Sequence, residues 1–303
     1  MTGESPLRAP PGERSVEELL QFGVVNLDKP AGPSAHQVAA WVRDMADLER
    51  AAHAGTLDPK VTGCLPSLLG DATRLAPVFL EGTKEYIAVL ELHGLPPTDM
   101  EATIAAFETD LYQKPPRKSA VSRRLRSREI YDLDVLELED RQALLRIRCE
   151  SGTYIRKLCH DLGMALGTGA HMGDLRRVAT DPFDDTDLVT LQDFSDGLAW
   201  AREDADETDE TYLRDIVSPA ERSMAHLPAI TIARNAAEQV AQGAPVYAPG
   251  VVETDDATAA LSPGADDLLA CYTPDGSAVC LGKLVGDPDA DEGEVVSLER
   301  VLV

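Results

Sequence analysis

The segment His53-Ala-Gly-Thr-Leu-Asp-Pro-Lys-Val-Thr-Gly-Cys64 places one carboxylate, Asp58, between two glycines. Pro59 biases the Asp58 backbone towards extended geometry, because the proline ring clashes with a helical residue before it. Gly55 and Gly63 permit tight turns and the close approach of a ligand to the backbone. A carboxylate on a rigid loop suits nucleophilic or general-base chemistry, although Asp-Pro in a loop is more often only a turn.

Helices and strands alternate on both sides of this loop. Ser34 is a candidate N-cap, and the apolar residues after it are spaced as the buried side of a helix: Val38, Trp41, Val42 and Met45. The apolar residues of Gly63–Leu80 predict a second amphipathic helix. Alternation predicts strands at Lys84–Leu92, Ala143–Glu150 and Asp174–Val178, and a helix follows Ser151-Gly-Thr and ends at Gly167. This mixture predicts an α+β domain.

The C-terminal quarter of the sequence has a different pattern. Short apolar runs separated by Gly and Pro turns predict a small β-module: Ile230–Ile232, Gly243–Gly250, Leu268–Tyr272 and Ala278–Gly282. Before it, Asp181–Glu221 carries fourteen acidic residues, which indicates a solvent-exposed segment or a linker. We expect the boundary between two domains within Ser195–His226.

The charge and apolar content of the chain limit the classes of protein to which it can belong. The formal net charge is -25, and only seven of the 28 basic residues are lysines. Nucleic-acid binders usually carry a basic balance, so one interpretation is that the chain avoids RNA. The other is an acidic surface adapted to molar salt, which screens the self-repulsion. No apolar run is long enough to span a membrane, and Met1–Glu13 has no apolar signal core, so we expect a cytoplasmic protein.

The cysteines and one basic segment add two expectations. None of the five cysteines forms a CxxC pair or has zinc-ligand spacing, so we expect buried thiols in a reducing compartment and no metal site.

Lys114–Arg128 contains seven basic residues and no acid. Such a run is usually a solvated face, but in so acidic a chain it is a candidate phosphate-binding strip, for which we name Lys114, Arg117, Lys118, Arg123, Arg124 and Arg126.

Four further motifs accompany the Asp58 loop in a fixed order. They are Val24-Val-Asn-Leu-Asp-Lys-Pro-Ala-Gly-Pro-Ser34, Lys84-Glu-Tyr-Ile-Ala88, Ser119-Ala-Val121 and Ser151-Gly-Thr-Tyr-Ile-Arg-Lys-Leu158. Each motif alone is weak, but the ordered set resembles the TruB family of pseudouridine synthases. The likeness is greatest to the archaeal and eukaryotic branch typified by dyskerin, and it extends from about Val16 to Val303.

The resemblance implies an architecture. Residues 23–222 would form a catalytic domain with a mixed β-sheet and an RNA cleft across one face. Residues 226–303 would form a PUA domain, a small β-barrel that binds RNA. Residues 1–22 would be an N-terminal extension that packs on the PUA domain.

The resemblance also implies roles for single residues. Asp58 would be the catalytic carboxylate, with Arg156 against it, and opposite charges about 4 Å apart gain roughly 4 kcal/mol at an effective dielectric of 20. Tyr86 would stack on the flipped base and act in proton removal from C5. Alone, Arg156 could equally be a surface arginine and Tyr86 a half-buried strand residue. With less weight, the substrate pocket would include Lys29, His53 and Leu175, and the RNA-binding turn of the PUA domain Gly243, Ala244 and Pro245.

The implied activity is the isomerisation of uridine to pseudouridine in RNA, which needs no cofactor. On this branch the enzyme would be the catalytic subunit of an H/ACA ribonucleoprotein that modifies rRNA, with the T-loop uridine of tRNA as a target that needs no guide. The implied partners are guide RNA, the small H/ACA core proteins and a kink-turn-binding ribosomal-type protein. The alternative is a scaffold or RNA chaperone in ribosome biogenesis, for which catalysis is secondary.

Overall fold

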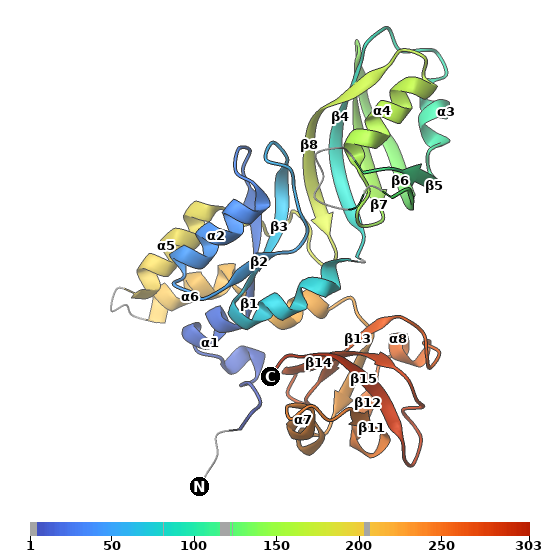
Figure 1. Cartoon of the computed structure of the whole chain (residues 1–303). Helices are drawn as coiled ribbons and strands as arrows, with labels where there is room; N and C mark the ends of the chain where they lie inside the picture. The colour runs from blue at the N-terminus through green and yellow to red at the C-terminus, as the bar shows by residue number, and fades with distance from the viewer. Residues whose placement is uncertain (1–4, 81, 116–121, 123, 203–206) are drawn as a thin grey trace.

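The structure is a computed structural model that describes residues 5–80, 82–115, 122, 124–202 and 207–303. Two β-sheets organise the chain, and the helices pack against them (Figure 1). The first sheet extends through the two upper lobes of the view, and the second forms the separate module that carries the C-terminal residues. This is the α+β architecture that the sequence predicts.

In the described residues the first sheet has nine strands in the order β5-β6-β7-β4-β8-β3-β1-β9, with β2 paired to β3. It is mixed, because β3 and β8 run parallel while the other pairs are antiparallel. The strands are β1 (Gly23–Lys29), β2 (Ala51–His53), β3 (Thr62–Leu69), β4 (Lys84–Leu92), β5 (Asp110–Gln113), β6 (Arg126–Glu139), β7 (Gln142–Cys149), β8 (Ala170–Thr180) and β9 (Ser218–Pro219).

Helices cover this sheet with their apolar sides. Ser34 caps its helix through a reciprocal capping box with Gln37, as its position in the sequence predicts. The helix after Ser151 forms as predicted and buries Ile155, Leu158, Cys159 and Leu162. The helices of this part are η1 (Pro11–Glu13), α1 (Val16–Gln21), α2 (Ala35–Met45), η2 (Gly70–Leu80), α3 (Met100–Ala105), α4 (Ile155–Ala165), α5 (Leu191–Arg202), α6 (Glu207–Ile216) and η3 (Ala220–Met224).

The prediction of a single helix over Gly63–Leu80 is wrong. Thr62–Leu69 is the buried strand β3, and only Gly70–Leu80 is helical, with 3-10 geometry. A short apolar run does not distinguish a strand buried on both faces from a buried helix. Here Leu65 and Leu69 lie in one apolar cluster and Cys64 and Leu68 lie in another, so both faces of β3 are buried.

Two other expectations are also wrong. Trp41 was expected in the core but is 45% exposed, because α2 turns Ala35, Val38, Ala39 and Val42 inwards and leaves Trp41 at the edge of that face. The acid-rich stretch, expected as a solvent-exposed segment or a linker, contains α5 and α6, so the linker alternative is wrong, whereas its described acidic residues are exposed or partly exposed. Phe194 and Leu213 in these helices are buried in the first core, and the acids lie among them.

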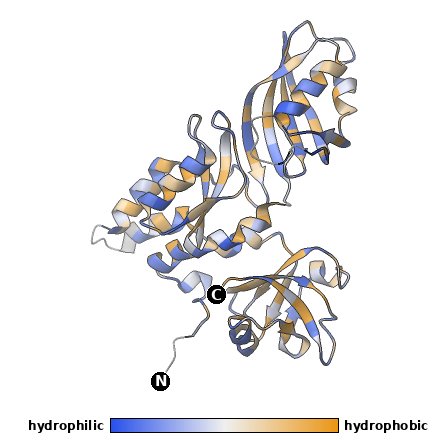
Figure 2. Cartoon of the chain, viewed as in Figure 1, coloured by the Kyte–Doolittle hydropathy of each residue, from blue (hydrophilic) through white to orange (hydrophobic). Residues whose placement is uncertain are grey.

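The second sheet is a six-stranded β-module in the described residues, in the order β11-β15-β14-β13-β10-β12. It confirms the short strands predicted from Ile230 onwards, and Figure 2 shows its apolar residues on the strands. Its elements are β10 (Ala229–Ile232), α7 (Arg234–Val240), β11 (Val246–Tyr247), η4 (Ala248–Gly250), β12 (Val251–Thr254), α8 (Asp256–Ala259), β13 (Leu268–Tyr272), β14 (Ala278–Leu284) and β15 (Glu294–Val301).

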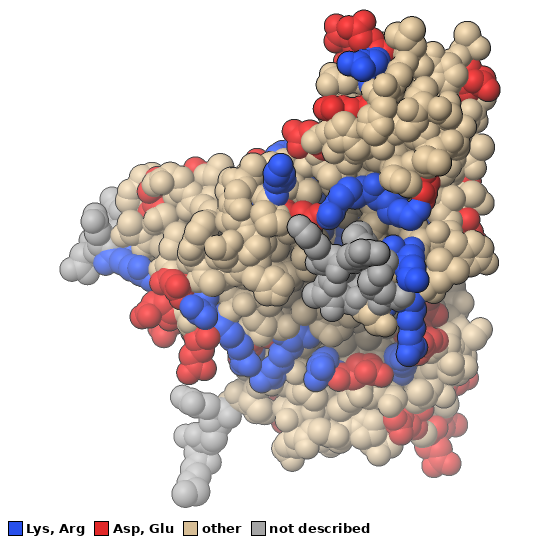
Figure 3. Space-filling view, turned by 45° about the horizontal axis from the view of Figure 1, so that its top comes forward, with Lys and Arg blue, Asp and Glu red and all other residues tan. Residues whose placement is uncertain are grey.

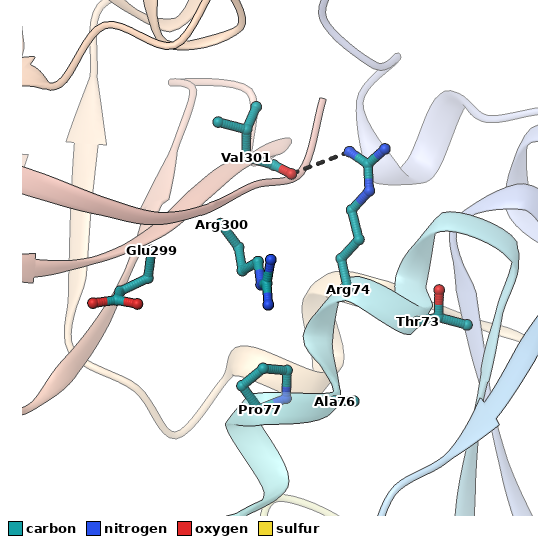
Figure 4. Close-up of a pocket in the computed structure, with 7 residues that line it drawn as sticks. All are labelled: Thr73, Arg74, Ala76, Pro77, Glu299, Arg300 and Val301. Carbon is teal, nitrogen blue, oxygen red and sulfur yellow. Dashed lines mark hydrogen bonds between the residues drawn. The ribbon is translucent and has the colours of Figure 1, made fainter.

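The two sheets meet along η2 and η3. One apolar cluster contains residues of both modules, including Phe79, Met224 and Leu281. A groove of about 550 Å³ lies between η2 and β15, and at its rim Arg74 donates to the Val301 carbonyl oxygen at 3.1 Å (Figure 4). This joint fixes the β-module against the domain that carries the Asp58 loop.

The segment before α1 also contacts the β-module. Arg8 Nε donates to the Leu302 carbonyl at 3.0 Å, and Ser277 Oγ donates to the Ala9 carbonyl at 3.2 Å. Arg14 is buried and makes a bidentate ion pair with Glu221, at 2.6 and 2.8 Å. In α1 itself, Leu19 belongs to the core of the first sheet. No helix in the described part of the chain is long and apolar enough to cross a membrane.

Candidate active site

The Asp58 loop connects β2 to β3. Its backbone is closed by a bond from the Val61 amide to the Asp58 carbonyl oxygen at 3.0 Å, and the Gly32 amide donates to the Pro59 carbonyl oxygen at 2.8 Å. Gly63 has a φ of +96°, and a Cβ there would lie 2.2 Å from the Arg177 carbonyl oxygen. Glycine is therefore required where the loop enters β3.

Lys29 lies beneath this loop, at the end of β1. The side chain is fully buried, and Nζ donates to the carbonyl oxygens of Pro30 (2.9 Å), Pro59 (3.1 Å) and Val61 (2.8 Å). Burial lowers the pKa of Lys29, and the negative charge of Asp58 opposes that change. The ammonium group thus binds the backbone on both sides of Lys60 and supports the loop that carries Asp58.

Arg156 pairs with Asp58 on the other side of the loop. Arg156 lies in the first turn of α4, and its Nη2 donates to Asp58 Oδ2. Both side chains are about half exposed, at 49% and 52%. The free chain therefore does not hold this pair in a dry cleft, and solvent screens the attraction to well below the value for partly enclosed charges.

Tyr86 lies on β4, where it is only 9% exposed and sits opposite Ile147 of β7 and Arg177 of β8. Burial raises the pKa of Tyr86, and the positive charge and hydrogen bond of Arg177 oppose that change. The phenol is neutral at physiological pH, so it can act as a hydrogen-bond donor or an aromatic surface.

His53 and Leu175 are the two other residues that the sequence assigns to the substrate pocket. His53 ends β2 and makes an edge-on ring contact with His36, with ring centroids 4.6 Å apart. Burial, then the charges of His36 and Arg177, lower the pKa of His53 to about 4, so this histidine is neutral near pH 7. Its Nδ1 is buried and has no hydrogen-bond partner among the described residues. Leu175 is 8% exposed on β8, opposite Ala88.

Arg177 is the prominent residue of this site that the sequence analysis missed. It is 1% exposed, Nε donates to the Cys64 carbonyl oxygen at 2.8 Å, and Nη2 faces the carbonyl oxygens of Ala54 (3.5 Å) and Gly55 (3.3 Å). The available signal was a pair of arginines, Arg176 and Arg177, in a strand whose faces alternate.

The basic strip is only partly within the described residues. Arg117, Lys118 and Arg123 lie outside them. Lys114, Arg124 and Arg126 are exposed and make no ion pair with another described residue, whereas Arg128 pairs with Glu150 at 2.9 Å. Figure 3 shows basic side chains gathered across one face of the molecule.

The turn between α7 and β11 contains the other residues proposed to bind RNA. Gly243 has a φ of +93°, and a Cβ there would meet no atom within 4 Å. The turn closes through the Gly243 amide to the Val240 carbonyl oxygen (2.8 Å) and the Ala244 amide to the Gln239 carbonyl oxygen (3.1 Å). Gly243, Ala244 and Pro245 therefore present backbone at an open surface.

All five cysteines are buried free thiols, as the sequence predicts, and burial raises the pKa of Cys64, Cys149 and Cys159 to about 12. The described residues contain no group of three or more His, Cys, Asp or Glu side chains that could hold a metal ion.

Three family models match the chain. They are described as the DKCLD (NUC011) domain over residues 2–39, the N-terminal domain of TruB family pseudouridylate synthase over residues 43–99, and the C-terminal domain of tRNA pseudouridylate synthase B over residues 156–225. The second model includes the Asp58 loop and Tyr86, and the third includes Arg156 and Arg177.

Several curated proteins are similar over almost the whole chain. A "Probable tRNA pseudouridine synthase B" of Halobacterium salinarum is 66% identical over 98% of this chain and 99% of its own length. The protein of the same name from Haloarcula marismortui is 63% identical over 98% and 94%. One from Pyrococcus abyssi is 43% identical over 97% and 87%.

Solved structures show the same fold. A chain of a Cbf5-Nop10-Gar1 complex superposes with a TM-score of 0.90 at 41% identity, covering 98% of this chain and 90% of that one. A chain of an archaeal box H/ACA sRNP Nop10-Cbf5 complex has a TM-score of 0.87 at 38% identity, covering 99% and 92%. A chain of an H/ACA RNP bound to a substrate RNA containing 2'-deoxyuridine has a TM-score of 0.88 at 38% identity, covering 99% and 91%.

Proposed function

This chain belongs to the TruB family of pseudouridylate synthases, in its Cbf5-like branch, and from that membership we propose that it isomerises uridine in RNA as the catalytic subunit of a guide-RNA ribonucleoprotein. The observation that carries the proposal is the pairing of Asp58 with Arg156. Two segments 98 residues apart, each within a family motif, bring together a carboxylate on the exposed Asp58 loop and a guanidinium in the first turn of α4.

The reaction is an isomerisation, so its atoms balance without a co-reactant. The bond between ribose C1′ and uracil N1 breaks, the base turns, and a bond forms between C1′ and C5. C5 then loses its proton, and N1 gains one. No electron is added or removed. The protein must supply a negatively charged group near the sugar and base, a surface that holds the freed base, and a group that removes the C5 proton.

We propose that Asp58 supplies the negatively charged group near the sugar and base. Its loop is fixed from below by Lys29, while its carboxylate remains accessible to a flipped nucleotide. Arg156 orients the carboxylate in the free chain. Entry of RNA would exclude water from the pair and strengthen the attraction, because charges interact more strongly when solvent is displaced.

Tyr86 is our candidate for holding the freed base and for removing the C5 proton. The ring lies on the same sheet as Leu175, and stacking of a base on an aromatic ring contributes roughly 1–3 kcal/mol. Together they offer an apolar surface for uracil. Arg177 is the cross-strand neighbour of Tyr86, and we propose that it orients the Tyr86 hydroxyl. His53, which is neutral near pH 7, would contact the target nucleotide without adding charge.

RNA binding outside the pocket would use two surfaces. The accessible basic residues of the Lys114–Arg128 strip would contact phosphates, and the Gly243–Pro245 turn would admit the RNA backbone. We propose domain boundaries to match: a catalytic domain over residues 23–222, a PUA domain over 226–303, and an extension over 1–22 that packs on the PUA domain. Contacts of Arg8 and Ala9 with the β-module support the last assignment.

The proposed partners follow from the solved relatives. Those structures contain Cbf5 with Nop10, with Gar1, or within an H/ACA RNP bound to substrate RNA. We propose that this chain assembles with equivalent core proteins and a guide RNA in the cytoplasm, and that pairing with the guide selects the uridine. The curated relatives are named for tRNA, so we propose the tRNA T-loop as a target that needs no guide.

The test is release of tritium from C5-labelled uridine in RNA, at molar KCl because the chain is so acidic. The chain is assayed alone on tRNA, and with guide RNA and core proteins on an rRNA fragment. Release only from the assembled mixture supports the guided enzyme, and release from tRNA by the chain alone supports the second target. If neither assay releases tritium while the chain still binds RNA, the catalytic proposal is overturned in favour of a scaffold.

A further inference from the structure

Arg177 has an unusual environment for a buried cation. It donates hydrogen bonds to the Cys64, Ala54 and Gly55 carbonyl oxygens, and Tyr86 is its cross-strand neighbour on β4. Ala54 and Gly55 begin the Asp58 loop, and Cys64 follows it at the start of β3. One guanidinium therefore spans both ends of the loop, and Arg177 is paired with Tyr86 across the sheet.

Arg177 makes no ion pair with a described carboxylate, although the chain has 53 acidic residues. Arg14 shows the usual alternative, since it is equally buried and makes a bidentate ion pair with Glu221. A buried charge without a counter-charge is costly, even when carbonyl oxygens accept its hydrogen bonds. Stability alone therefore does not explain why an arginine occupies this position.

The register of the sheet explains how Arg177 lies next to both the Asp58 loop and Tyr86. On β8 it is paired with Gly63 of β3 on one side and with Tyr86 of β4 on the other. Gly55 leaves room for the guanidinium, because a Cβ there would lie 3.1 Å from Arg177 Nη1. A planar group with several fixed donors can join three such acceptors, whereas a lysine cannot reproduce that geometry.

We propose that Arg177 is a positioning residue that holds the Asp58 loop and the Tyr86 hydroxyl in one arrangement, so that carboxylate and phenol act on the same nucleotide. The inference rests on the proposed function, because it takes the roles of Asp58 and Tyr86 from there. Arg177 itself would touch no reacting atom. Its loss would misplace two groups by a fraction of an ångström while leaving the RNA-binding surfaces intact.

The experiment compares Arg177→Met and Arg177→Lys with Arg176→Met in the preparation in which the wild-type chain is active. Arg176 is the matched control: it is the neighbouring arginine, but its guanidinium binds Asp28 through two hydrogen bonds of 2.9 and 3.0 Å instead of the carbonyl oxygens that Arg177 binds. Single-turnover rates, the RNA concentration for half-saturation and the melting temperature are measured for each variant. Tyr86→Phe and the double variant with Arg177→Met complete a mutant cycle.

We expect Arg177→Met to lower the single-turnover rate about 10- to 100-fold, with half-saturation unchanged within about twofold. In the Tyr86→Phe background the same change should cost at least about threefold less, because the two residues act together. Arg177→Lys keeps the charge and should fold even if Arg177→Met does not, yet its rate should stay low because one ammonium cannot span the loop. Arg176→Met should retain the wild-type rate.

Three outcomes would overturn the inference while the wild-type chain remains active. They are a wild-type rate for Arg177→Lys, effects of Arg177→Met and Tyr86→Phe that simply multiply, and a rate loss that the Arg176→Met control shares. If the wild-type chain forms no pseudouridine in any preparation, the proposed function fails and this inference fails with it.

Discussion

The Asp58 loop is held by cations on two sides, and the two sides differ in kind. Arg156, on the outer side, pairs with the carboxylate itself, and both groups are about half exposed. Lys29, on the inner side, is fully buried and binds only backbone carbonyl oxygens near Asp58. The outer contact is screened by solvent, whereas the inner contact determines where the backbone lies. Under the proposed function, the outer contact would serve the reaction and the inner one the stability of the loop.

The largest expected effect comes from removing the group that both cations surround. Asp58→Asn preserves the size of the side chain but removes its charge, so we expect the single-turnover rate to fall by a factor of about 10³ or more. RNA affinity, measured by filter binding at the same KCl concentration, should stay within about threefold of wild type. A rate near wild type would show that Asp58 is not needed for the reaction. The contacts of Arg156 and Lys29 with its loop would then have no bearing on catalysis.

The inner contact should dominate stability. Lys29→Met leaves buried carbonyl oxygens without a donor, so we expect the free energy of unfolding to fall by about 2–4 kcal/mol. Lys60→Met is the matched control, because Lys60 is an exposed lysine on the same loop, and it should change stability by less than about 0.5 kcal/mol. Denaturant unfolding measures both, and equal effects of the two variants would contradict a supporting role for Lys29.

The outer contact should dominate activity instead. Arg156→Gln should lower the free energy of unfolding by less than about 1 kcal/mol, because exposed ion pairs contribute little. The single-turnover rate should nevertheless fall about 10- to 100-fold, since the pair is enclosed once RNA binds. A large loss of stability with an unchanged rate would reverse the comparison between Arg156 and Lys29.

The smallest expected effect is a dependence on pH. Burial and neighbouring charges lower the pKa of His53 from 6.5 to about 4, so between these values the unfolded chain binds a proton that the folded chain does not. This contribution to stability is fully present above pH 6.5 and declines as the pH falls towards 4. His53→Gln should flatten that part of the curve of unfolding free energy against pH. An unchanged slope would mean that another group titrates there.

Much of the site was predictable from the sequence because the motifs are local. The Asp58 loop, the cap at Ser34, the alternation in β4 and the position of Arg156 in the first turn of its helix depend on neighbouring residues. Arg177 was not predictable in this way, because its partners lie more than 90 residues earlier and meet it only through sheet pairing. The strand β3 was missed for the same reason, since only tertiary pairing separates a doubly buried strand from a helix.

The hydrogen bond between Arg8 and Leu302 joins residues 294 positions apart. During synthesis Arg8 leaves the ribosome long before its acceptor exists, so the first segment cannot complete its contacts until almost the whole β-module has been made. At about 5–20 residues per second, that delay lasts roughly 15–60 s. Arg8 can pair with Asp71 of the first domain during that time, so only its contact with Leu302 must wait for the β-module to be completed.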